Sequence, residues 1–142
     1  MKRLVLASKK LNYKKYLVVG PGYEENQIKE IEEMIDSKYE IIYKPKSLKK
    51  YIDKVEFVIT ATGTTVYEVL ASGKKLIPYF MVDNQKNIYE YVEKRGVLGL
   101  GNIEECDIEE KLKYILNQKN YFSEIKIDGK GVFRIVEEIM KL

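Results

Sequence analysis

The sequence predicts an α/β domain built on a doubly wound, mostly parallel, Rossmann-like sheet. Short apolar runs alternate with segments whose apolar residues recur at helical spacing along most of the 142 residues. The runs are continuously apolar, which is typical of parallel strands that are covered by helices on both faces. Because the chain contains no internal repeat and no linker, we expect one domain that spans residues 1–142.

The apolar runs predict strands at Tyr16–Gly20, Tyr39–Tyr43, Glu56–Ala61, Leu76–Phe80 and Val97–Leu100. The helical spacing predicts helices at Gln27–Asp36, Ser47–Lys54, Thr65–Ser72, Asn84–Lys94, Asp107–Asn117 and Gly131–Lys141. Gly73 and Gly96 follow two of these helices and are natural helix-ending residues.

The first residues of the chain are unusual for this fold. Arg3–Ser8 is apolar enough for a strand, but a parallel neighbour needs a crossover of about a dozen residues. Only residues 9–15 precede the next strand, so a short helix carrying Leu4 and Leu6 is the better prediction. Because such domains usually begin with a strand, we expect that the first strand is missing, and that the chain is truncated or half of something larger.

Composition excludes several classes of function. The net charge is +3, from 25 basic and 22 acidic residues, which is too small to indicate nucleic-acid binding. The lysine-rich stretch Lys44–Lys54 is more typical of a solvated helix face than of a phosphate site. Cys106 is the only cysteine, no apolar run is long enough to span a membrane, and no signal peptide is evident, so a cytoplasmic protein is expected.

The chain contains no histidine. Serine–histidine and cysteine–histidine catalysis and histidine-ligated metal sites are therefore excluded within it. One cysteine and scattered carboxylates do not form a metal site either. We predict no catalytic residue, no metal and no cofactor in this chain.

The stretch TATGTTVYE, Thr60–Glu68, follows a predicted strand and begins a helix. Gly63 allows a ligand to approach the backbone, Thr62 or Thr64 can cap the helix, and the first helical N–H groups suit a diphosphate. Glu68, one turn into the helix, suits the two hydroxyls of a ribose. A capped helix with Glu68 as an ordinary surface charge explains the same residues equally well.

Two further strand-to-helix loops compete for a ligand at the carboxyl ends of the strands. In VVGPGYEEN, Gly20 and Gly22 begin a dinucleotide fingerprint, but Glu25 occupies the third glycine position. A plain turn is the favoured interpretation there, and a wall of the ligand cleft is the alternative. In VDNQKN, capping by Asp83 or Asn84 is favoured over the alternative, in which the amides of Asn84 and Gln85 contact phosphate or sugar.

Taken together, these residues resemble the C-terminal domain of the spore-coat polysaccharide and pseudaminic-acid UDP-sugar hydrolase family. That family belongs to the GT-B glycosyltransferase superfamily. The resemblance covers roughly residues 5–142, and four pieces agree in order: VVGPGY, TATGTTVYE, DNQ and IDGKGVFRIV. It implies half of a GT-B fold that binds UDP or a UDP-sugar.

The resemblance also implies a role for each matching residue. Glu68 would bind the ribose, residues 63–65 (Gly63, Thr64 and Thr65) would line the diphosphate, and Asn84 and Gln85 would face the phosphate or sugar. The loop Lys44–Leu48, with Pro45 and Leu48, would pack against uracil through its backbone, and Gly22 would keep the cleft open. Thr62 replaces a small residue of the family and would narrow the phosphate pocket. Asp128 and Gly129 would order the return of the last helix.

The N-terminal domain of the family, which carries its catalytic histidine, has no counterpart in this sequence. The chain is therefore expected to bind the donor nucleotide without completing the chemistry, and to need that domain or a partner chain. A homo-oligomer is also expected if an unpaired sheet edge is exposed. The alternatives are an NAD-binding Rossmann domain and a non-catalytic partner subunit of a two-chain glycosyltransferase.

Overall fold

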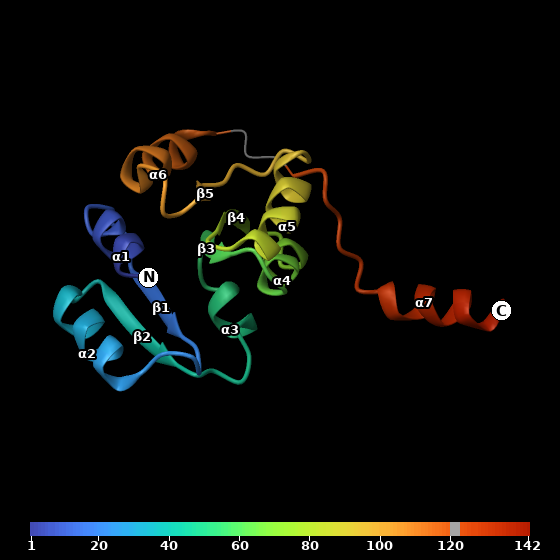
Figure 1. The fold of residues 1–142 in the computed structure, drawn as a ribbon, viewed down its shortest axis with the longest axis horizontal. Helices are drawn as coiled ribbons and strands as arrows, with labels where there is room; N and C mark the ends of the chain where they lie inside the picture. Colours follow the sequence, from blue (N-terminus) through green and yellow to red (C-terminus); the bar gives the residue numbers. More distant parts are fainter. Residues whose placement is uncertain (120–122) are drawn as a thin grey trace.

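The computed structural model describes residues 1–119 and 123–142, and its core is a parallel sheet in two parts with helices on both faces (Figure 1). β1 (Lys15–Val19) pairs with β2 (Tyr39–Tyr43), and β4 (Lys75–Phe80) pairs with β3 (Phe57–Ala61) and β5 (Gly101–Asn102). The helices are α1 (Lys2–Ser8), α2 (Glu25–Met34), α3 (Lys49–Ile52), α4 (Thr65–Ala71), α5 (Asp83–Glu93), α6 (Ile108–Asn117) and α7 (Gly131–Met140). The predicted parallel α/β architecture is confirmed.

Neighbouring residues of β4 supply two separate apolar cores, one on each face of the sheet. Leu76 packs with residues from α3, α4, α5 and the turn after α5: Ile52, Val66, Val69, Val92 and Val97. Ile77 packs with residues from α6 and the segment before it: Leu100, Ile103, Ile108, Leu112 and Ile115. Leu4 of α1 joins the second core, so the sheet is covered on both faces as a doubly wound fold requires.

Several predicted helix boundaries are confirmed by their terminal contacts. The carboxylate of Asp107 accepts a hydrogen bond of 3.0 Å from the N–H of Glu110 and caps α6. Gly73 and Gly96 follow α4 and α5 with φ angles of +68° and +89°, a conformation that glycine adopts at little cost. At the start of the chain, α1 is a helix, as its leucine spacing predicts.

The strand predicted at Val97–Leu100 is wrong, because that segment is irregular and β5 begins only at Gly101. The reason lies in β4. The N–H of Leu100 donates to the C=O of Pro78 at 2.9 Å, so Pro78 faces this segment. Proline has no N–H to return to Leu98, and the ladder therefore cannot form there.

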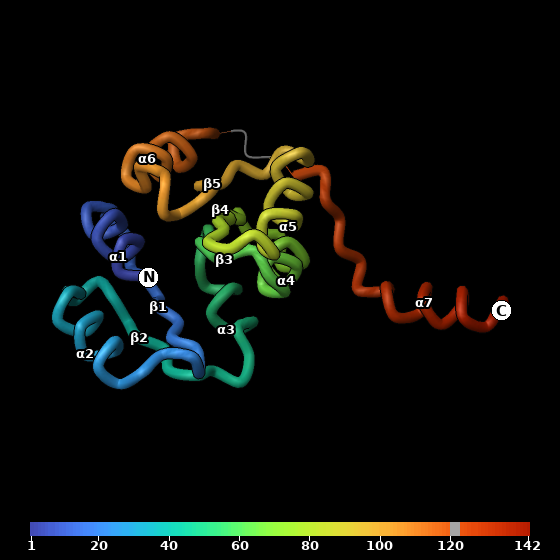
Figure 2. Tube along the Cα trace, in the orientation of Figure 1, coloured from blue at the N-terminus to red at the C-terminus, as the bar shows by residue number. Residues whose placement is uncertain are grey.

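The last helix begins as predicted but does not return to the domain. The carboxylate of Asp128 accepts two hydrogen bonds from the guanidinium of Arg134, at 2.7 and 3.1 Å, and one from the N–H of Lys130. These contacts lower the pKa of Asp128 to about 2. No residue of α7 is buried, and the helix projects away from the sheet (Figure 2). The expected return of the last helix is therefore wrong for this structure.

We predict that Gly99→Ala destabilises the domain by about 1–3 kcal/mol, because a methyl group there would overpack the core. A Cβ at Gly99 would lie 2.7 Å from the backbone oxygen of Pro78 and 2.7 Å from the ring of Tyr89. Thermal unfolding of the variant should show a clear fall in Tm. Gly20→Ala is the control, since a Cβ at Gly20 has no heavy atom within 4 Å. Equal stability of the two variants would contradict the prediction.

Candidate functional site

A buried hydrogen bond joins two of the loops that the sequence singled out. The side chain of Thr62, which is 2% exposed, donates from Oγ1 to the backbone C=O of Gln85 at 2.7 Å. The N–H of Thr62 donates to the C=O of Tyr79 at 2.8 Å, which anchors the loop to the end of β4. The structure thus holds the start of α4 and the start of α5 together at the carboxyl edge of the sheet.

The helix caps predicted for α4 and α5 are not found. Thr64 is the N-cap residue of α4 but its side chain makes no capping hydrogen bond, and the hydroxyl of Thr62 is engaged with Gln85 instead. Val82 is the N-cap residue of α5, so neither Asp83 nor Asn84 caps that helix. The polar side chains at both helix starts are therefore not consumed by capping.

Free N–H groups mark the turn into α4. In the part of the chain that the structure describes, the N–H groups of residues 63–65 donate to no acceptor. A Cβ at Gly63 would meet no heavy atom within 4 Å, so this backbone faces open space. Glu68 is exposed one turn further, and among the described residues its carboxylate has no hydrogen-bond or ion-pair partner. The N–H donors of residues 63–65 and the carboxylate acceptor of Glu68 therefore lie within about one helical turn of each other.

The second loop approaches the same edge through Tyr23. Burial raises the pKa of Tyr79 at the end of β4, and the neighbouring Tyr23 hydroxyl raises it further. Burial also raises the pKa of Tyr23 itself. Gly22 is exposed, and a Cβ there would have no heavy atom within 4 Å. The loop after β1 therefore borders the region beside β4, although a Cβ at either of its glycines would meet no heavy atom within 4 Å.

The loop after β2 forms one side of an open concavity of about 770 Å³. Pro45 lines it together with Tyr51 and Lys50, whose ammonium lies 4.8 Å from the centre of the Tyr51 ring. Leu48, in contrast, packs against the core beneath α4 and α5. The structure thus places Pro45 at a surface hollow and Leu48 in a structural position.

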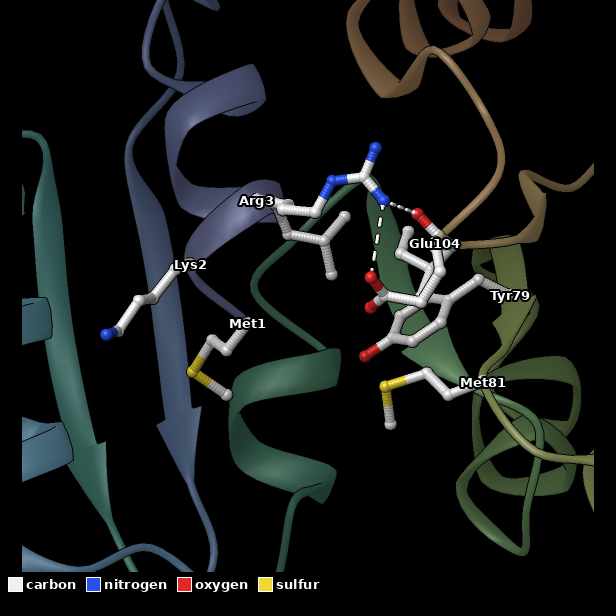
Figure 3. Close-up of a pocket in the computed structure, with 8 residues that line it drawn as sticks. Met1, Lys2, Arg3, Tyr79, Met81 and Glu104 are labelled. Atoms are coloured by element: carbon white, nitrogen blue, oxygen red, sulfur yellow. Dashed lines mark hydrogen bonds and ion pairs between the residues drawn. The ribbon is translucent and has the colours of Figure 1, made fainter.

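A second cavity, of about 300 Å³, lies between the start of α1 and the end of β4 (Figure 3). Figure 3 shows Met1 on one side of it, across from Tyr79 and Met81. Arg3 donates to the backbone oxygens of Ile103 and Cys106 and lies 3.7 Å from a carboxylate oxygen of Glu104. Sequence reasoning missed this cavity, because its walls come from three segments that lie far apart in the sequence and share no motif.

Other kinds of site find no support in the described residues 1–119 and 123–142. These residues contain no cluster of three His, Cys, Asp or Glu side chains that could hold a metal ion. None of their helices has both the length and the apolar character needed to cross a bilayer. Comparisons of the chain with models of protein families, with curated proteins and with solved structures found no match.

We predict that Thr62→Val destabilises the domain by about 1–2 kcal/mol, because it removes the buried donor while keeping the side-chain volume. Chemical denaturation measures the change. Thr64→Val is the matched control: that side chain is exposed and makes no capping hydrogen bond, so a change within about 0.5 kcal/mol is expected. The coupling of the two loops would be refuted by a Thr62→Val variant as stable as the control.

Proposed function

We propose that this chain is the UDP-sugar-binding domain of a GT-B-type nucleotide-sugar hydrolase or glycosyltransferase that acts in surface polysaccharide biosynthesis. The observation that carries the proposal is the hydrogen bond between Thr62 and Gln85. It brings the small-residue loop and the Asn-Gln turn together at the carboxyl edge, which is where open α/β sheets bind ligands. The resemblance to the UDP-sugar hydrolase family supplies the choice of nucleotide.

The diphosphate is assigned to the turn into α4. The free N–H groups of residues 63–65 offer donors to phosphate oxygens, and no side chain at Gly63 obstructs their approach. Asn84 is exposed and its amide is a further donor. The side-chain oxygen of Gln85 accepts from the N–H of Met81 at 3.0 Å, which leaves the NH₂ group to face a phosphate or sugar.

The nucleoside is assigned to the two flanking features. The carboxylate of Glu68 accepts hydrogen bonds from the 2′- and 3′-hydroxyls of the ribose. Uracil packs in the hollow beside Pro45, where the backbone of the loop after β2 reads its edge and Tyr51 adds an apolar face. Leu48 supports this loop from the core and does not contact the base.

The chemical contribution of this domain is to hold the departing diphosphate. Hydrogen-bond donors that are fixed before the reaction stabilise negative charge as it develops on the leaving group. The general base is assigned to another domain or another chain, because the family resemblance implies a histidine in that role and this chain contains none.

Calorimetric titration of the purified chain with UDP, UMP, ADP and NADH tests this assignment. We expect UDP to bind more tightly than UMP, because only UDP carries the second phosphate that the turn into α4 would hold. ADP and NADH should bind more weakly than UDP. Preference for NADH would favour an NAD-binding domain, and no binding of any of the four would overturn the proposal for this chain.

A single substitution tests the role of Glu68. We predict that Glu68→Ala weakens UDP binding by more than about 0.5 kcal/mol, the usual limit for surface changes, because the ribose hydroxyls lose their acceptor. The same calorimetric titration measures it. Glu33→Ala is the control, since Glu33 is an exposed carboxylate near the C-terminal end of α2 and has no part in the proposed site. Unchanged affinity in Glu68→Ala would remove Glu68 from the site.

A further inference from the structure

The sheet is interrupted between β1 and β3. Among the described residues, β1 pairs with β2 alone and β3 pairs with β4 alone. Doubly wound sheets of the Rossmann type have the strand order 3-2-1-4-5-6, in which one central strand joins the two halves. The order observed here matches that arrangement with the central position vacant: β2-β1, a vacant position, then β3-β4-β5. We call this position the strand slot, bounded by β1 and β3.

The backbone edges on both sides of the strand slot are unpaired. On β3, the bonds from Lys75 N–H to Glu56 C=O and from Thr62 N–H to Tyr79 C=O show that even-numbered residues bond to β4. In a parallel strand, alternate residues direct their N–H and C=O groups to opposite sides, so the odd-numbered residues of β3 direct theirs away from β4. The N–H groups of Phe57, Ile59 and Ala61 therefore point into the slot, and the described residues provide no backbone acceptor for them.

β1 presents the complementary edge. The bonds from Lys15 N–H to Lys38 C=O and from Lys44 N–H to Val19 C=O assign its odd-numbered residues to β2. Tyr16 and Val18 therefore direct their N–H and C=O groups into the slot, again with no backbone partner among the described residues. β1 and β3 thus each present one strand edge whose backbone groups have no backbone partner among the described residues.

The burial of side chains on β3 and β4 is also consistent with a missing strand beside β3. β4, which has a strand on each edge, contains the fully buried residues Leu76, Ile77 and Pro78. No residue of β3 is fully buried, although β3 lies in the middle of the molecule. In a parallel sheet covered on both faces, central strands are normally the most buried. The partial exposure of β3 follows from the lack of a neighbour on one edge.

Within the described residues, aromatic contacts and no backbone hydrogen bonds join β1 and the segment before it to β3 and α3. The rings of Tyr13 and Phe57 meet edge to face with their centres 5.4 Å apart, at the amino ends of β1 and β3. Tyr16 of β1 lies 5.8 Å from Tyr51 of α3, measured between ring centres. Tyr13 remains 43% exposed, so this contact covers the slot only loosely.

We propose that the strand slot binds an extended segment of a partner polypeptide, which inserts as a strand parallel to β1 and β3. The occupant needs free hydrogen-bonding groups on both of its edges, because both walls of the slot are unpaired. It needs apolar side chains on both faces, because helices cover the sheet on each side. The outer strands of a second copy do not meet the first requirement, since β2 and β5 each have one edge already paired.

Residue-resolved amide hydrogen exchange tests the proposal on the intact chain. The probe is a capped peptide of about six valine and isoleucine residues flanked by lysines. Without peptide, the amides of residues 16, 18, 57, 59 and 61 should exchange at least tenfold faster than those of residues 58 and 60. With peptide, these amides should become protected, whereas Ile41 on the outer edge of β2 should not change.

Two modified peptides serve as controls. N-methylation of alternate residues removes the donors on one edge of the peptide, and methylation of the remaining residues removes those on the other edge. If the peptide inserts between β1 and β3, either modified peptide should fail to protect the amides. If it pairs with one outer strand alone, the peptide methylated on its free edge should still protect them.

Four results would overturn the proposal, and the first three concern exchange in the free chain and with peptide. They are slow exchange of the slot amides in the free chain, absence of peptide protection at millimolar concentration, and protection that tolerates one methylated edge. Protection of the same amides on raising the protein concentration alone would assign the slot to a second copy and would likewise overturn the assignment to a partner. These measurements involve no nucleotide, so they stand apart from the UDP-binding proposal.

Discussion

The burial of β4 between two apolar layers is the constraint on which the rest of the structure depends. Leu76 and Ile77, both fully buried, belong to opposite cores, so α4 and α5 are held on one face and α6 on the other. Burial of this kind contributes about 1.5–3 kcal/mol for each large apolar side chain. The carboxyl end of β4 then fixes the candidate site, because Tyr79 accepts the N–H of Thr62.

The sequence predicts most of the fold because the signals for strands and helices are local. The apolar run Tyr39–Tyr43 indicates a strand by its own residue types, and Gly73 indicates a helix end by its conformational freedom. The prediction of a strand at Val97–Leu100 is wrong for a non-local reason. This segment lies beside Pro78 of β4, which has no N–H to donate, and only the register of the two segments reveals that. The cavity beside Arg3 and Glu104 is equally non-local.

The positions of the two loops of the candidate site were predictable from the sequence, but the contacts between the loops were not. The turn at Gly63 and the helix start near Asn84 are both recognisable from sequence, and the fold places both at the carboxyl edge. Sequence spacing allows Thr62 or Thr64 to cap the helix, yet the hydroxyl of Thr62 bonds to Gln85, and the two residues meet only after the chain has crossed β4. A short polar side chain has several local partners, and tertiary packing selects among them.

The strand slot also bears on how the proposed nucleotide site is assembled. Pro45 follows β2 in one part of the sheet, whereas Gly63 and Glu68 follow β3 in the other. Within each part, backbone hydrogen bonds fix the geometry, but between the two parts the contacts are made by side chains such as Tyr13 and Phe57. Ring contacts of this kind are worth about 0.5–1.5 kcal/mol, less than a ladder of several hydrogen bonds. A strand in the slot would set the distance between the base and diphosphate positions, so filling it would order the site as well as the sheet.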